Sequence, residues 1–454
     1  MKKLIPVVLM VLLVVSFILV GCATTTPTTP ATSTSPTTPA ATGPAEIRIG
    51  VPAAQTGGAA GFGEGGVFGL QAAADDINKA GGIMISELNK KLPVRLIVVD
   101  NGSDPNKAGV LAENLVVQDK VNFLISTGPL DFNPPMAVIA ERNKVPFLAG
   151  PGPYEAWNAM RTAVTPPWQY SWMSSFAIAT PPKEGDFRVG KPGYTMFDAW
   201  SGALKSFQSQ TNNKIALLAS DDPDGRGWYQ AFAPEVGKLG MTAYKSDSSF
   251  GLVPGETTDF STLIQAWKAE DCQLVWANCP APFFGAFWKQ AQTLGYKPKQ
   301  VFATRGGLFY SDVNSWGGNL PNGICNEMFW NPSIKGVKGI GDTTPVSLDQ
   351  RWTSAKNQPT NQCVGWLYSD FQVMVDAIQR AGSLNGDKIN QALAQTDLMT
   401  VDGRVVFDSD HYSRIPVAFG QWQKTNKPWV WDNVVVYSDN ELLQTNGTLI
   451  FPIP

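Results

Sequence analysis

Ile47-Arg48-Ile49-Gly50-Val51, followed by Val67-Phe68-Gly69-Leu70-Gln71-Ala72-Ala73-Ala74-Asp75-Asp76-Ile77-Asn78-Lys79, is the stretch that decides the fold. The first segment alternates and is β-branched, which predicts a strand. The second places Val67, Leu70, Ala74 and Ile77 at helical spacing and stops at Gly81-Gly82, which predicts a helix.

The same strand–helix unit recurs downstream. β-rich runs at 92–99, 121–126 and 145–148 alternate with helical patterns at 104–119 and 135–142. Asp104 suits a helix N-cap, and Pro105 suits the first helical position. Repeated βα units predict a parallel sheet that is covered by helices on both faces.

A second series of this kind starts at Trp200. Helices are expected at 200–210, 228–239, 260–270 and 284–294, and strands at 214–219, 242–246, 273–277 and 301–304. Helices at 364–381 and 387–394 and β-rich segments at 404–407 and 417–422 follow. The sequence therefore predicts an α/β protein with two doubly wound, Rossmann-like lobes.

The N-terminus has the pattern of an export signal. Lys2 and Lys3 precede an apolar run over 4–20, and Leu19-Val20-Gly21-Cys22 resembles the lipobox of bacterial lipoproteins. We expect a signal peptide at 1–21 and a lipidated Cys22, so that the mature protein is exported and anchored to the bacterial membrane. An uncleaved membrane anchor is the alternative, because about 17 apolar residues can just span a bilayer.

Residues 23–44 are almost entirely Thr, Pro, Ala and Ser, with no aromatic or charged residue. Such a segment buries too little apolar surface to fold, and its prolines keep it extended. We expect 22–45 to be a tether and the folded body to start at Glu46.

Composition narrows the function. The chain has 35 Lys+Arg against 38 Asp+Glu, a net charge of -3, so no surplus of positive charge points to nucleic acid. His411 is the single histidine, which argues against His-based zinc sites and Ser-His catalysis. We expect that the protein is not an enzyme and that it binds no cofactor and no metal ion. The 15 Trp, 23 Phe and 10 Tyr belong to the core or line a cleft.

Four cysteines remain beside Cys22: Cys272, Cys279, Cys325 and Cys363. An exported protein permits disulfides, and four cysteines allow three pairings. A disulfide between Cys325 and Cys363 is one of the pairings that the sequence allows.

Several motifs together resemble one family. Gly57-Gly58-Ala59-Ala60-Gly61-Phe62-Gly63-Glu64-Gly65, Ala73 to Ile83 and Asp100 to Pro105 resemble the first lobe of the branched-chain amino-acid binding proteins of ABC importers, which are type I periplasmic binding proteins of the leucine/isoleucine/valine-binding family. Asp221 to Gly227 and Gly255 to Ser261 resemble the second lobe. The resemblance covers about 46–436 and its motifs recur in order.

The resemblance implies a monomer with a solute held between lobes that close about a hinge, and an ABC permease as partner. It implies lobe 1 at 46–167 plus 328–400 and lobe 2 at 168–327 plus 401–454. The chain would cross near 165–170, near 326–331 and near Val401. An insertion at 180–194 departs from the family pattern.

The resemblance also implies binding residues. Family members that bind amino acids hold the ammonium with a carboxylate of the second lobe, but Arg305 occupies that position here, and Asp224 stands where a tyrosine is common. We hypothesise a carboxylic acid with an apolar or aromatic body, since arginine pairs with anions. An Arg305–Asp224 pair that neutralises itself is the alternative. By position after predicted strands or in the glycine-rich segment, the other expected ligand-binding residues are Phe62, Leu130, Asp131, Gly152, Tyr154, Asn278 and Pro280.

Other classes fit less well. Gly61-x-Gly63-x-x-Gly66 matches a dinucleotide-binding pattern, yet nine residues separate Val51 from Gly61, and Asp100 lies far beyond the expected spacing. Gly185 to Lys191 resembles a P-loop but continues into Pro192, and Asp221 to Gly225 resembles a calcium loop without its terminal glutamate. A ligand-sensing receptor shares this fold; we expect an importer component because no transmembrane segment follows before Pro454.

Overall fold

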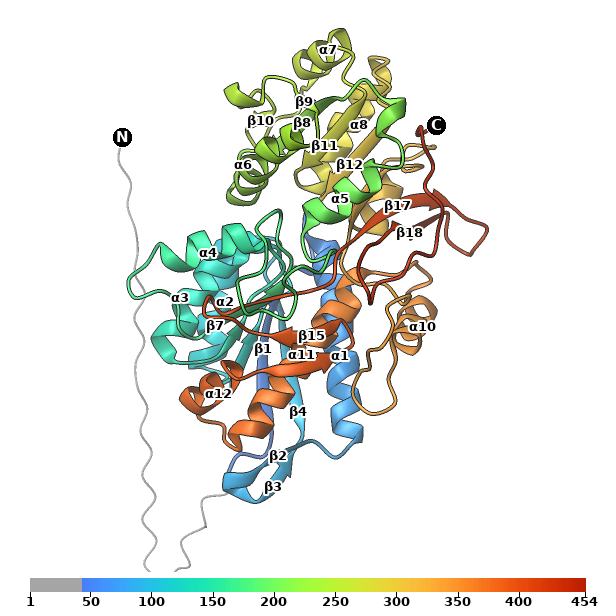
Figure 1. The fold of residues 1–454 in the computed structure, drawn as a ribbon. Helices are drawn as coiled ribbons and strands as arrows, with labels where there is room; N and C mark the ends of the chain where they lie inside the picture. Colours follow the sequence, from blue (N-terminus) through green and yellow to red (C-terminus); the bar gives the residue numbers. More distant parts are fainter. Residues whose placement is uncertain (1–42) are drawn as a thin grey trace, which may run out of the picture. The chain divides into compact units, whose positions relative to one another are not determined.

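A computed structural model describes residues 43–454, which form one compact unit (Figure 1). The predicted signal peptide, Cys22 and most of the tether lie outside the described residues. Between 43 and 454, no helix combines the length and the apolar character needed to cross a membrane.

The first sheet is fully parallel, as predicted. Its strand order is β16 (Tyr412–Arg414), β7 (Ser171–Ser175), β6 (Phe147–Leu148), β5 (Phe123–Ile125), β1 (Ile47–Ala53) and β4 (Val94–Asp100). Ile47, Ile49 and Val51 face one hydrophobic cluster, whereas Leu124 faces another, so both faces are buried. We call this sheet and its helices the first lobe.

Helices cover both faces of the first sheet. On one face lie α1 (Ala60–Lys79), α11 (Gln362–Ala381) and α12 (Gly386–Leu393). On the other lie α2 (Pro105–Val117), α3 (Asn133–Asn143) and α4 (Tyr154–Thr162). The Asp104 side chain accepts hydrogen bonds from the backbone N–H groups of Asn106 and Lys107, as an N-cap does.

The second sheet has the order β10 (Leu252–Val253), β8 (Lys214–Ser220), β11 (Leu274–Asn278), β12 (Gln300–Thr304), β13 (Cys325–Met328), β17 (Ala418–Lys424) and β18 (Trp431–Tyr437), and β9 (Thr242–Ala243) also pairs with β8. The strands are parallel except β17 and β18, which pair antiparallel. Helices α5 (Met196–Leu204) and α6 (Pro223–Lys238) cover one face, and α7 (Ser261–Ala269), α8 (Ala281–Thr293) and α9 (Tyr310–Ser315) cover the other. This second lobe confirms the predicted α/β class.

Smaller elements complete the unit. Two antiparallel hairpins pair β2 (Ile83–Ile85) with β3 (Lys90–Leu92) and β14 (Asp397–Thr400) with β15 (Gly403–Val406). Helix α10 (Pro345–Lys356) precedes α11 and carries a capping box at Thr344.

Three segments connect the two sheets, and two of them lie later in the chain than expected. The first is 176–195, after β7; the second is 329–361, after β13; the third is 415–417, between β16 and β17. Because β7 and β16 pair within the first sheet, the predicted crossings at 165–170 and near Val401 are wrong, as are lobe boundaries at 168 and 401. The serine-rich Ser171–Ser175 strand is buried without the apolar pattern that marks a strand.

The insertion at 180–194 lies in the first crossing and contacts the end of β16, next to the third. Arg414 donates hydrogen bonds to the carbonyl oxygens of Thr180 (2.7 Å) and Pro181 (3.0 Å). The fully buried Arg188 pairs with Asp186 and donates to Ser413 Oγ at 2.9 Å. The insertion therefore ties two of the crossings together.

The glycine-rich segment is not an open loop. Helix α1 begins at Ala60, and its glycines sit where neighbouring backbone approaches closely: a Cβ on Gly63 would lie 2.0 Å from the Ala54 carbonyl oxygen, and one on Gly69 would lie 2.2 Å from that of Val364. These glycines serve packing of α1 against its neighbours. That role accounts for the dinucleotide-like spacing without a bound phosphate.

The four described cysteines are buried free thiols, so the Cys325–Cys363 bond is not formed. Burial raises the pKa of the Cys272 and Cys325 thiols to about 12. They behave as small apolar side chains.

Two other buried carboxyl groups lie away from the cleft described below. Asp370 on α11 and Asp402 in the turn between β14 and β15 are each 1% exposed. Burial raises the pKa of both, and Asp370 raises that of Asp402 further. Neither oxygen of Asp402 has a hydrogen-bond partner in the described structure.

The α1–α11 contact yields a stability prediction. Gly69→Ala should lower the free energy of unfolding by about 1–3 kcal/mol or more, because the new methyl group would collide with rigid backbone. Gly237→Ala is the matched control: it lies in α6 with nothing within 4 Å of the new Cβ, and alanine should stabilise that helix by about 0.5–1 kcal/mol. Thermal unfolding of both variants measures the difference, and equal effects would contradict the packing role.

Candidate functional site

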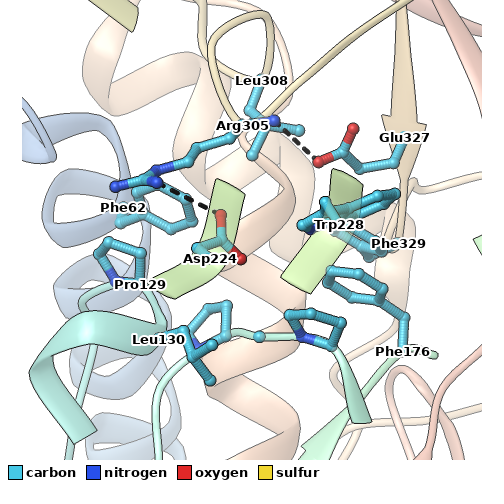
Figure 2. A pocket seen from close by; sticks show the side chains of 13 residues that line it. Phe62, Pro129, Leu130, Phe176, Asp224, Trp228, Arg305, Leu308, Glu327 and Phe329 are labelled. Carbon is cyan, nitrogen blue, oxygen red and sulfur yellow. Dashed lines mark hydrogen bonds and ion pairs between the residues drawn. The ribbon is translucent and has the colours of Figure 1, made fainter. Parts of the chain in front are cut away.

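A cavity lies between the two lobes, at the carboxyl ends of parallel strands, where doubly wound sheets bind ligands (Figure 2). It encloses about 320 Å³ of unfilled space, including space open to solvent. The first lobe contributes residues that follow β1, β5, β6 and β7, and the second contributes residues that follow β8 and β12 or lie at β13. The lining residues are Phe62, Pro129, Leu130, Pro151, Gly152, Pro153, Phe176, Asp224, Trp228, Arg305, Leu308, Glu327 and Phe329.

A second, outer cavity of about 770 Å³ of unfilled space adjoins the first. Phe62, Pro129 and Arg305 line both, so they separate the inner cavity from its outer neighbour. The outer cavity also includes Asp131, Pro280 and Asp312.

Arg305 is the centre of the charged network. Its guanidinium lies 3.2 Å from Asp131 of the first lobe and 3.0 Å and 3.3 Å from Asp222 and Asp224 of the second. Burial alone would lower the pKa of Arg305, but the three carboxylates together raise it. Both terminal nitrogens are therefore committed to protein carboxylates, and the Arg305–Asp131 pair crosses between the lobes.

The backbone at Arg305 has a positive φ of 53°, an uncommon conformation for a residue with a side chain. Arg305 directly follows β12, and its backbone N–H donates to Glu327 Oε1 at 2.9 Å. One residue thus directs its guanidinium to three aspartates and its N–H to a glutamate. Conformations of this kind cluster at functional sites.

Asp224 sits at the start of α6 and is buried. It accepts a hydrogen bond from Asn278 Nδ2 at 3.1 Å, and Asn278 in turn accepts one from Thr304 at 2.9 Å. Burial raises the pKa of Asp224 to about 6 against the opposing effect of Arg305. Helix α6 starts at Pro223 because Asp222 caps it, accepting from the Gly225 N–H at 2.7 Å.

Glu327 is the third polar group of the inner cavity. It lies in β13, is 2% exposed, and uses one oxygen to accept from Arg305. Its Oε2 has no hydrogen-bond partner in the described part of the chain. Burial raises the pKa of Glu327 to about 8, and Asp224 adds repulsion.

The remaining walls are apolar. Phe176 and Phe329 stack with ring centroids 4.4 Å apart, and Trp228 lies 5.7 Å from Phe176. Pro129, Pro151 and Pro153 on the first-lobe side have no N–H group, and the Gly152 N–H already donates to Ser175 Oγ. The first-lobe side of the cavity therefore offers apolar contacts but few free backbone N–H groups that could donate to an anion.

The structure brings most of the predicted site residues together. Phe62, Leu130, Gly152, Asp224 and Arg305 line the inner cavity, Asp131 and Pro280 line the outer one, and Asn278 supports Asp224 from behind.

Tyr154 is placed elsewhere. Its hydroxyl donates to Asp410 at 2.6 Å, its ring packs edge-on against Tyr412, and it lines neither cavity. Tyr154 therefore lies apart from the predicted residues that line the two cavities.

Sequence reasoning missed Glu327, Trp228, Phe176, Phe329 and Leu308. Phe176 and Phe329 stand at the start of crossings, and the first of these crossings was expected earlier in the chain. Glu327 is an acidic residue inside the fully buried strand Cys325–Met328, half of which is polar. Such a residue has to be compensated, because a buried charge is costly alone.

Comparisons with known proteins agree with this architecture. A family model described as periplasmic binding protein matches residues 46–427. The chain is 25% identical over 391 residues to the Leu/Ile/Val-binding protein homolog 2 of Brucella abortus, which covers 84% of this chain and 91% of that protein. It is 26% identical over 370 residues to the amino acid binding protein of Pseudomonas aeruginosa, with 80% and 86% covered.

Solved structures share the fold. The leucine binding protein LivK of Thermotoga maritima matches with a TM-score of 0.63 at 17% identity, covering 83% of this chain and 95% of that one. An ABC-transporter solute binding protein of Rhodopseudomonas palustris, solved with 3,4-dihydroxybenzoic acid, matches with a TM-score of 0.64 at 16% identity, covering 88% and 99%.

The Arg305–Asp131 pair yields a prediction about the two lobes. Asp131→Asn removes the carboxylate charge that pairs with the Arg305 guanidinium and should weaken the contact between the lobes by about 1 kcal/mol. The expected result is a larger radius of gyration in small-angle scattering of the ligand-free protein. Asp222→Asn, which touches the same guanidinium within one lobe and retains an N-cap residue, should leave the radius unchanged. An unchanged radius for Asp131→Asn would contradict a bridging role.

Proposed function

Because the chain belongs to the periplasmic binding protein family, we propose that it is the extracytoplasmic solute-binding component of an ABC importer. The observation that carries the proposal is the inner cavity, which takes its walls from both lobes and combines apolar rings with three polar groups. The names of the relatives, which describe amino-acid and branched-chain amino-acid binding, support the same role.

The arrangement of two lobes joined by three crossings supports binding and release of a solute for transport, and not catalysis. Three crossings allow the lobes to rotate, and a solute that contacts both lobes favours the closed form by its differential affinity. An ABC permease then recognises the closed, loaded monomer. The proposal assigns no catalytic residue.

The solute is proposed to be a small organic molecule with an apolar or aromatic body that differs from leucine. Amino acids, amides and carboxylic acids follow from the sequence, and solved relatives of the fold hold isoleucine and 3,4-dihydroxybenzoic acid. The three prolines and the occupied guanidinium of Arg305 argue against a free carboxylate as the main anchor. We therefore do not assign a ligand carboxylate to Arg305.

A ligand screen tests the proposal. At least one small organic solute should raise the melting temperature of the 43–454 unit by several degrees at about 100 times its Kd, which corresponds to about 2.7 kcal/mol. The same solute should reduce the radius of gyration. Leu308→Trp should abolish both effects by filling the cavity, whereas Val138→Trp, on an exposed position of α3, should not. Turnover of a compound without any change in scattering would refute a transport role.

We also propose that a lipid on Cys22 anchors the mature protein to the membrane. Mass spectrometry of the mature N-terminus should find a lipid on Cys22 and no residue from 1–21. Cys22→Ala should release the protein from the membrane fraction, while Cys363→Ala, at a buried thiol, should leave it bound. An unmodified chain that starts at Met1 would instead support an uncleaved anchor.

A further inference from the structure

A hairpin lies at the end of the first lobe that is opposite the cavity. Strands β2 and β3 form this hairpin, and residues 86–91, which we call the hairpin tip, are all exposed. Strand β3 continues through Pro93 into the amino end of β4, whereas the cavity lies at the carboxyl ends of the strands. Figure 1 shows β2 and β3 at the lower end of the first lobe, with the second lobe at the upper end.

The described chain begins beside the hairpin tip. A Cβ built on Gly43 would lie 3.9 Å from Leu88 Cδ2, and the Ile47 N–H donates to the Pro93 carbonyl oxygen at 2.8 Å. The 21 residues of 22–42 reach at most about 75 Å even when fully extended. A lipid on Cys22 would therefore keep the hairpin end of the body within that distance of the bilayer.

Three lysines at this end carry unpaired charge. Lys90 and Lys91 belong to the hairpin tip, and Lys79 ends helix α1, which lies beside the hairpin because Lys91 Nζ donates to the Ala80 carbonyl oxygen at 3.4 Å. None of the three forms an ion pair with a described carboxylate, and residues 1–45 contain no Asp or Glu. Glu87, the acidic residue of the tip, already pairs with Lys388.

Leu88 adds an apolar group to the hairpin tip. Its side chain is 40% exposed, although leucine is usually buried. An apolar side chain can enter the headgroup layer of a bilayer while neighbouring lysines pair with anionic lipid phosphates. The hairpin tip combines both kinds of side chain at the end of the body from which the chain continues toward Cys22.

We propose that the hairpin tip, together with Lys79, is a docking surface for an anionic phospholipid membrane. The ammonium groups of Lys79, Lys90 and Lys91 pair with lipid phosphates, and Leu88 enters the headgroup layer. This inference rests on the proposed anchor at Cys22: the anchor limits the distance of the body from the bilayer, and the docking surface sets its orientation. Because the hairpin tip and the cavity lie at opposite ends of the first sheet, the docked body directs its cavity away from the bilayer.

The composition of the surface favours lipid over a protein partner. Lysine is depleted in protein–protein interfaces, whereas each lysine near an anionic membrane surface contributes about 1 kcal/mol to binding. Three lysines and one leucine would hold a free protein only weakly. An anchored body meets the membrane at a high effective concentration, so a weak contact is sufficient to orient it.

Lysine labelling of the unmodified lipidated chain tests the proposal. The chain is incorporated into vesicles of phosphatidylcholine alone or of equal parts phosphatidylcholine and phosphatidylglycerol, and acetylation by sulfo-N-hydroxysuccinimide acetate is read by mass spectrometry. On the anionic vesicles at low salt, the labelling rate of Lys79, Lys90 and Lys91 should fall at least about fivefold, and high salt should restore it. Lys205 and Lys297, exposed lysines of the second lobe, serve as internal controls and should react equally on both vesicles.

A charge-matched pair of variants tests the surface itself. Lys79→Gln combined with Lys90→Gln should return the labelling rate of Lys91 on anionic vesicles to its rate on phosphatidylcholine. Lys205→Gln combined with Lys297→Gln removes the same charge from the second lobe and should leave Lys91 protected. All four positions are exposed, so both variants should keep the melting temperature of the unmodified protein.

The outcomes separate this inference from the proposed function. Equal labelling of the three lysines on both vesicles overturns it, as does protection of Lys91 that persists in the Lys79→Gln, Lys90→Gln variant. Protection that appears only when the permease is present would identify a protein partner and overturn the lipid assignment. Both variants lie outside the cavity, so the ligand screen should give the same melting shift, and solute binding stands whether or not the hairpin docks.

Discussion

The buried guanidinium of Arg305 is the interaction on which the cleft depends. A charge at this depth is tolerated only with partners, and its partners come from both lobes, Asp131 on one side and Asp222 and Asp224 on the other. The left-handed backbone at Arg305 allows the same residue to donate its N–H to Glu327. Arg305 therefore both bridges the two lobes and supplies the charge and the N–H group at the polar side of the cavity.

The same arrangement places the ends of both sheets around one cavity. The strands of each sheet are parallel at the cleft, so their carboxyl ends bring the loops of both lobes to one cavity. The segments that connect the lobes are themselves braced, since Arg188 and Arg414 tie the insertion at 180–194 to the end of β16. In the proposed closure of the lobes, these hydrogen bonds would couple the first and third crossings.

Periodicity in the sequence predicted most strands and helices because apolar side chains recur at the spacing that each sheet face requires. It failed where burial does not use apolar residues. Ser171–Ser175 is a buried strand of mostly polar residues, so the first crossing was placed too early. Apolar spacing predicts a helix only from Val67, whereas α1 begins at Ala60, because close approach to Ala54 and Thr127 requires glycine at Gly63 and Gly66 and leaves no apolar pattern there. The family resemblance singled out Arg305 and Asp224, and both line the inner cavity. Position after a strand could not show that the Tyr154 hydroxyl donates to Asp410.

Buried carboxyl groups differ in what can compensate them. Asp370 and Asp402 are enclosed away from the cavity, and the protein bears the cost of their burial in its own stability. Glu327 is buried to the same degree, but one of its oxygens accepts a hydrogen bond from the Arg305 N–H, so its burial is partly compensated. Arg305 therefore compensates carboxyl groups of the cleft in two ways: its guanidinium pairs with three aspartates from both lobes, and its backbone N–H donates to Glu327.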